Sequence, residues 1–78
     1  EDVIITSDDK IITSLFIVFD FVEEVEWGQI IQERTNYLRL RIVKSKQYSA
    51  KSEEKLLYNI RKFVGKDMDI RVEYVSPE

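Results

Sequence analysis

Apolar and polar positions follow a different pattern in each part of the chain, and each pattern predicts an element. Residues 3–5 and 11–12 are β-branched runs on either side of the polar stretch 7–10. Two such runs around a short polar stretch predict a small hairpin. The polar stretch holds no glycine, so a four-residue loop is expected in preference to a type I′ turn.

Residues 13–24 fit two patterns. The run at 15–19 has the β propensity of a buried strand. The same segment also carries apolar residues at the i, i+3, i+4 and i+7 positions of a helix, namely Leu15, Val18, Phe19 and Val22. We interpret it as a helix with Thr13 or Ser14 as N-cap. Phe16 and Ile17 then lie outside the core stripe.

Two strands are predicted at residues 27–33 and 37–43. The second is the clearest, because its even positions are apolar and its odd positions include Tyr37, Arg39 and Arg41. The connection around Thr35 and Asn36 is short, so the two strands are expected to pair antiparallel.

A second helix is predicted to start at the N-cap Ser52 and to stop at Gly65. Its apolar stripe consists of Leu56, Leu57, Ile60, Phe63 and Val64. A final strand follows at residues 70–74. This order predicts an α+β, ferredoxin-like sandwich: an N-terminal hairpin, then α-β-β-α-β, with an antiparallel sheet and two helices on one face.

The amino-acid composition limits the kinds of catalytic and metal site that the chain can form. The 78 residues, enough for one small domain, include no Cys and no His. Thiolate metal sites, a cysteine nucleophile and a Ser–His–Asp triad are therefore excluded within this chain, and we expect no metal site. The net charge of −3 argues against nucleic-acid binding. No apolar run is long enough for a membrane span. The chain holds no basic n-region followed by an apolar h-region, so no signal peptide is expected within it, and the lack of cysteine fits a cytoplasmic location.

Several surface features are candidates for function, each with a plainer interpretation beside it. Glu23, Glu24 and Glu26 are more simply a solvated helix end than an acid–base pair. Tyr37, Arg39 and Arg41 point from one strand face. They could contact an anionic surface or another domain, and the plainer interpretation is a sheet face that is solvated or covered by a helix. Trp27 is a candidate interface residue or a core edge. Phe16 and Ile17 are either scattered exposed residues or a docking patch that allows weak homo-oligomers.

The ordered segments of the chain resemble a known family. The start at residues 1–11 is similar to the opening of the C-terminal domain of phenylacetate–CoA ligase-like adenylate-forming enzymes. Residues 29–33, 38–43, 52–57 and 72–75 also resemble that family. The similarity spans essentially the whole chain and is greatest for the capsule-biosynthesis or coenzyme-synthetase-like branch.

The resemblance implies that residues 1–78 are the mobile C-terminal lid of an acyl-activating ligase, with a large N-terminal adenylation domain in the same chain. Such enzymes use ATP, Mg²⁺ and coenzyme A to form an acyl-adenylate and transfer its acyl group to a thiol. By position, Glu1 and Asp2 match the hinge. The turn of Asp8, Asp9 and Lys10 matches the cofactor-facing turn, although its two carboxylates would repel a polyphosphate.

No catalytic residue is expected in the chain, because the family's adenylation lysine would follow residue 78, so the chain alone is expected to be inactive. The start at Glu1, with Met68 as the only methionine, favours an excised domain. The alternative is a free-standing ferredoxin-like module with a small-molecule-binding or regulatory role.

Overall fold

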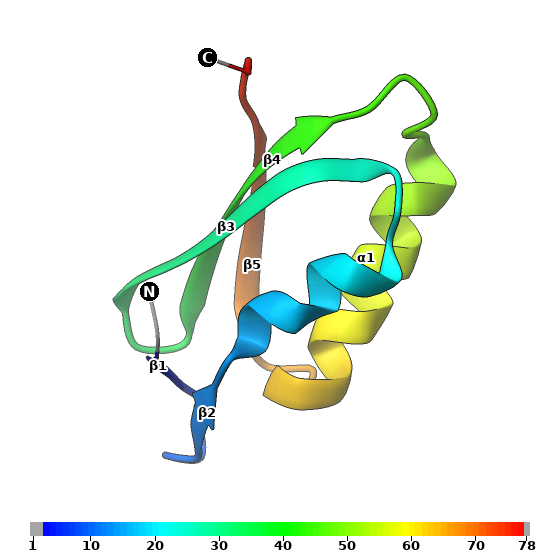
Figure 1. Cartoon of the computed structure of the whole chain (residues 1–78). Coiled ribbons are helices and arrows are strands. Elements are labelled where there is room, and N and C mark those ends of the chain that lie inside the picture. Colours follow the sequence, from blue (N-terminus) through cyan, green and yellow to red (C-terminus); the bar gives the residue numbers. More distant parts are fainter. Residues whose placement is uncertain (1–2, 78) are drawn as a thin grey trace.

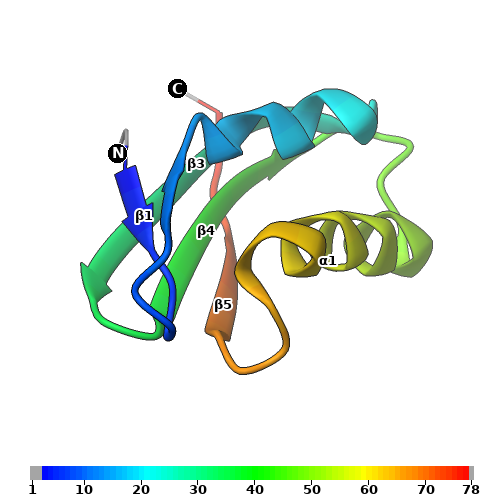
Figure 2. The same cartoon turned by 90° about the horizontal axis from the view of Figure 1, so that it is seen from below.

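A β-hairpin leads into a three-stranded sheet, and both helices pack on one face of that sheet (Figures 1 and 2). The computed structural model describes residues 3–77. The elements in chain order are β1 (Val3–Ile5), β2 (Ile11–Thr13), η1 (Leu15–Phe21), β3 (Val25–Arg34), β4 (Tyr37–Lys44), α1 (Ala50–Val64) and β5 (Asp69–Tyr74). The α+β class and the predicted element order are confirmed.

The sheet has the strand order β3-β4-β5 and is mixed, whereas an antiparallel sheet was predicted. β3 pairs antiparallel with β4, as expected from their short connection. β5 runs parallel to β4, with Leu40 opposite Val72. The correction has a simple cause: α1 carries the chain back to the other end of the sheet, so the strand after it enters in the same direction as β4.

The predicted hairpin is present and forms its own two-stranded sheet of β1 and β2. Its outer edge is joined to β3 by the side chain of Gln32. The backbone N–H of Ile5 donates to Oε1 of Gln32 at 2.8 Å, and Nε2 of Gln32 donates to the carbonyl of Ile5 at 2.8 Å. One amide side chain therefore satisfies both free backbone groups of a strand residue, as a neighbouring strand would.

Residues 15–21 are helical, as interpreted, but the helix is of the tighter 3₁₀ type. Ser14 occupies the N-cap position, one of the two residues predicted for it, but it adopts a left-handed backbone with φ 61° and its side chain makes no capping hydrogen bond. Leu15, Val18 and Val22 are buried as expected. The ring of Phe19 lies over Gly28 of β3, so close that a Cβ at Gly28 would sit 2.6 Å from it.

The second helix begins earlier than predicted. Its N-cap is Ser49, and Ser52 is the third helical residue, where its Oγ accepts the backbone N–H of Ser49 at 3.1 Å. Leu56, Ile60 and Val64 are buried as expected. Phe63 was placed in the same stripe, but it is 42% exposed because it lies at the rim of the helix contact.

The core lies between the sheet and the two helices. Leu38, Leu40 and Ile42 of β4 are completely buried there, which confirms the alternation predicted for that strand. The odd-numbered residues of β4 point to the other face of the sheet. Neither helix covers that face, and it carries the polar side chains considered below.

Candidate functional site

The predicted sites that the structure describes fall in three separate places. The hinge residues Glu1 and Asp2 lie outside the described residues. The turn with Asp8, Asp9 and Lys10 is exposed at the tip of the hairpin. Phe16 and Ile17 lie on η1, whereas Trp27 points to the uncovered face of the sheet beside β4. The fold therefore does not bring the predicted interface residues together.

The hairpin turn uses one of its two carboxylates internally. Oγ1 of the buried Thr6 donates to the carboxylate of Asp8 and accepts the backbone N–H of Lys10 at 3.0 Å. The hydrogen bond from Thr6 is the main cause that lowers the pKa of Asp8 below its usual value of 3.8. The carboxylate of Asp8 is thus committed to the turn, and Asp9 takes the left-handed backbone, with φ 64°.

η1 carries more exposed apolar residues than the sequence indicated. Phe16 is 56% exposed and Ile17 is 38% exposed, so both lie outside the core. Phe21 is exposed as well, and it forms a shallow groove with Asn59, Lys62 and Phe63 of α1. Phe21 was not singled out from the sequence and Phe63 was assigned to the core stripe of its helix, because helical periodicity alone does not say where α1 ends its contact with η1.

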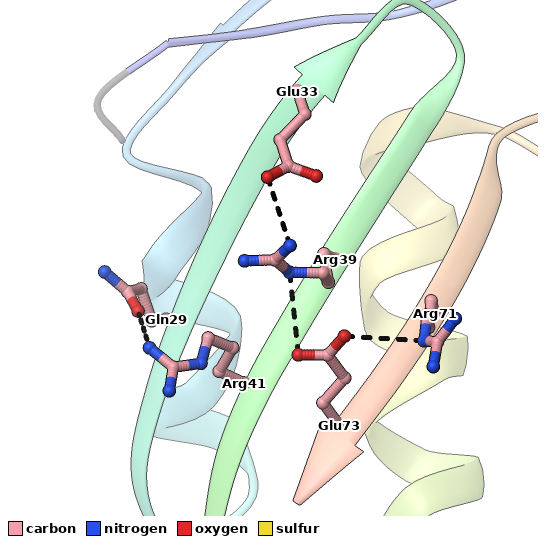
Figure 3. Close-up of polar contacts among 6 residues, drawn as sticks. All are labelled: Gln29, Glu33, Arg39, Arg41, Arg71 and Glu73. Atoms are coloured by element: carbon pink, nitrogen blue, oxygen red, sulfur yellow. Dashed lines mark hydrogen bonds and ion pairs between the residues drawn. The ribbon is translucent and has the colours of Figure 1, made fainter. Parts of the chain in front are cut away.

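Three arginines follow one another across the uncovered face of the sheet (Figure 3). Arg39 forms ion pairs with Glu33 at 3.1 Å and with Glu73 at 3.5 Å. The second contact is an ion pair without hydrogen-bond geometry, since Nε of Arg39 has no hydrogen-bond partner. Arg71 meets the other carboxylate oxygen of Glu73 at 3.4 Å. These pairs are partly exposed, so each adds little to stability.

The third arginine is bound differently. Arg41 lies opposite Glu73 in the strand register, yet the carboxylate of Glu73 turns towards Arg39 and Arg71 (Figure 3). Arg41 donates to the side-chain oxygen of Gln29 at 3.3 Å, a long contact with a neutral group. Among residues 3–77, no carboxylate forms an ion pair with Arg41.

A groove of about 450 Å³ opens beside Arg41. Its lining consists of Glu26, Trp27, Arg41, Val43 and residues 75–77. Trp27 is 48% exposed, whereas Val43 is buried at the floor. The groove therefore combines an open indole surface, aliphatic walls and one guanidinium group, and sequence reasoning had considered Trp27 and Arg41 only separately.

A tyrosine pair joins the end of the sheet to α1. The hydroxyl of Tyr74 donates to Glu53 at 3.0 Å and lies 3.1 Å from the hydroxyl of Tyr48. Burial and these hydrogen bonds raise the pKa of Tyr74 well above its usual value of 10.0. Tyr74 stays protonated at neutral pH, which suits a structural tie and not a proton-transfer role.

The glutamates at 23, 24 and 26 are not assembled into an acid–base pair. Glu24 meets Lys55 of α1 at 3.4 Å, while Glu26 lines the groove on the uncovered face. Hydrogen bonding to its own backbone, with a contribution from Lys55, lowers the pKa of Glu24. In the part of the chain that the structure describes, no cluster of three or more metal-ligating side chains occurs.

Within residues 3–77, no helix has the length and hydrophobicity required to cross a bilayer. A family model described as the CapK C-terminal domain matches residues 4–77 of the chain. The comparison with curated proteins and the comparison with solved structures gave no match.

Proposed function

We infer the function of this chain from its family, because the chain belongs to the CapK C-terminal domain family. We propose that it is the mobile C-terminal domain of an adenylate-forming, acyl-activating ligase, as its resemblance to phenylacetate–CoA ligase-like enzymes implies. The observation that carries the proposal is the family match, which covers residues 4–77 and so includes all of the helices and strands except Val3, the first residue of β1.

In the proposed parent enzyme, a large N-terminal adenylation domain of the same chain binds ATP, Mg²⁺ and a carboxylate, and coenzyme A accepts the acyl group in the cytoplasm. The C-terminal domain changes its orientation between adenylation and thiol transfer, a hinge motion coupled to chemistry. This domain supplies the moving surface, and the site on the large domain supplies the carboxylate specificity.

The attachment of the hairpin supports a rigid-body motion. Ile4 of β1 and Thr6, which directly follows the strand, are buried, and Ile5 between them is held by Gln32. The strand that directly follows the proposed hinge thus belongs to the packed body of the domain. A rotation of the domain would then be absorbed by the backbone ahead of β1, which agrees with the proposed hinge at Glu1 and Asp2.

The proposal is tested in the full-length parent enzyme with the hinge variant Asp2→Pro and the control Asp2→Ala. Proline fixes φ, so it restricts a residue that must change its backbone torsions. We expect carboxylate-dependent ATP–pyrophosphate exchange to be largely retained in Asp2→Pro, and acyl transfer to coenzyme A to fall. The alanine variant is expected to retain both.

A parent protein that supports no carboxylate-dependent exchange with any of a panel of carboxylates would overturn the ligase proposal. If each half-reaction ran at the same rate in Asp2→Pro as in Asp2→Ala, the hinge assignment would be wrong, but the ligase proposal would stand. The 78-residue chain by itself is expected to give no exchange.

A further inference from the structure

The uncovered face of the sheet distinguishes Arg41 from its two neighbours. Arg39 and Arg71 share Glu73 and, with Glu33, form a network in which each guanidinium has a carboxylate partner. Arg41 has only the 3.3 Å contact with Gln29, and among residues 3–77 no carboxylate pairs with it. Its planar fork of donors is therefore available to an oxyanion.

The groove beside Arg41 has the features of a small-molecule site. Its volume of about 450 Å³ lies within the range of ligand pockets, roughly 300–1,000 Å³. Trp27 presents a half-exposed indole, and Val43, Val75 and Pro77 add aliphatic walls. Ring stacking on an indole and burial against such walls favour a flat, apolar ligand body.

We propose that this groove binds a small organic anion in which a planar ring carries one carboxylate or phosphate group. The ring lies against Trp27, and the oxyanion accepts hydrogen bonds from the guanidinium of Arg41. The groove lies on the sheet face opposite η1 and α1, and the proposal does not depend on the function of the parent enzyme.

Glu26 sets the charge that the groove accepts. Its side chain lines the same groove, so it repels a ligand that brings a second negative charge. A carboxylate carries one negative charge, whereas a phosphate monoester carries nearly two near neutral pH. The groove should therefore prefer an aromatic carboxylate to the corresponding phosphate ester.

Trp27 is the only tryptophan of the chain, so its fluorescence reports directly on the groove. The 78-residue chain is titrated with benzoate, with phenyl phosphate, with acetate as the anion without a ring, and with benzyl alcohol as the ring without a charge. The shift of the Trp27 indole N–H signal in NMR spectra provides an independent readout. The same titrations are run on Arg41→Gln and on Arg34→Gln.

Arg34 is the matched control because it is exposed, stacks over Tyr37 at the far end of β4 and is absent from the groove lining. Both variants remove one positive charge. We expect saturable binding of benzoate, weaker binding of phenyl phosphate, and no saturation with acetate or benzyl alcohol at the same concentrations. Arg41→Gln should weaken benzoate binding about tenfold or more, as expected for loss of a charged hydrogen bond, and Arg34→Gln should not.

Three results would overturn the proposal. The first is no saturable change of the Trp27 signals with benzoate or phenyl phosphate. The second is equal affinity for acetate and benzoate. The third is unchanged benzoate affinity in an Arg41→Gln protein whose NMR spectrum shows that it is folded. Acetate binding as tight as benzoate would mean that Arg41 meets a simple carboxylate, such as an acidic side chain of another protein segment. Tighter binding of phenyl phosphate would leave the site in place but identify phosphate esters as its ligands, against the role given to Glu26.

Discussion

Gln32 joins two sheets that share no strand pairing. Its carboxamide forms a donor–acceptor pair with the backbone of Ile5, and both hydrogen bonds are 2.8 Å long. An intramolecular hydrogen bond contributes about 0.5–1.5 kcal/mol in net terms, so the pair matters mainly for holding the hairpin edge in place.

Replacing Gln32 with Leu should lower the free energy of unfolding by about 1–2 kcal/mol and accelerate hydrogen exchange at the amide of Ile5. Gln32→Glu keeps the acceptor but loses the donor, so its effect should be intermediate. Denaturant titration and NMR-detected exchange measure both quantities. Gln47→Leu, in the exposed connection before α1, serves as the control. Unchanged exchange at Ile5 in the Leu variant would contradict this role.

The hydrogen bond between Thr6 and Asp8 makes a second prediction at this scale, because it lowers the pKa of Asp8 in the folded state. A carboxyl group with a lowered folded-state pKa stabilises the fold above its unfolded-state pKa. That contribution disappears as the pH falls through the folded-state pKa, which here means below 3.8.

In Thr6→Val the pKa of Asp8 should rise towards 3.8, and the part of the acid-dependent stability loss that is due to Asp8 should shrink. An NMR titration of the Asp8 carboxyl carbon follows the pKa, and urea titrations at neutral and acid pH follow the stability. Thr6→Ser keeps the hydroxyl and should behave like the native chain. The idea fails if the pKa of Asp8 is the same in all three proteins.

At the scale of elements, η1 is fixed against β3 by the contact between Phe19 and Gly28. A Cβ at Gly28 would lie 2.6 to 2.7 Å from three atoms of the Phe19 ring, so any larger residue forces the ring or the helix to move. Alanine is normally better than glycine within a strand. At position 28 we expect the opposite, so alanine should be less stable than glycine.

Gly28→Ala should therefore destabilise the domain by about 1–3 kcal/mol, the usual cost of overpacking. The same substitution should cost much less in a Phe19→Leu background, because the smaller side chain leaves room for the methyl group. A double-mutant cycle by denaturant titration measures this coupling. Additive effects of the two substitutions would show that the contact does not position η1.

At the scale of the whole molecule, three of the exposed apolar residues lie on one short helix. Phe16, Ile17 and Phe21 of η1 are all exposed, and Phe63 of α1 adjoins Phe21 across a shallow groove. Covering such a surface gains roughly 25 cal/mol per Å² of apolar area. The two helices thus expose apolar side chains that could be buried by self-association, on the side of the sheet opposite the Trp27 groove.

We predict weak self-association of the chain through η1, which Phe16→Ser or Ile17→Ser should reduce without loss of folding. Sedimentation equilibrium measures the association, and circular dichroism confirms the fold. Ile11→Ser removes an exposed apolar residue from the hairpin and should leave the association unchanged. A native chain that is strictly monomeric at high concentration would rule the prediction out.

The sequence by itself determined the elements whose signal is local. Two β-branched runs around residues 7–10 specified the hairpin, strict alternation specified the buried face of β4, and the stripe of Leu56, Ile60 and Val64 specified α1. These patterns predict the elements correctly because the periodicity of a strand or a helix depends only on residues that are close in sequence. The family resemblance also came from the sequence, since it rests on the order of such segments.

The tertiary structure decided what depends on distant partners. The packing of the elements decided three features: the parallel pairing of β4 with β5, the exposure of Phe63 and the 3₁₀ geometry of η1. The local hydrophobic periodicity of the sequence does not predict them. The sequence likewise did not predict that Glu73 forms ion pairs with Arg39 and Arg71 and none with Arg41. Residues 27, 41, 43 and 75–77 form one groove only because the strand register places them side by side, so the chemistry of that groove is a property of the folded sheet.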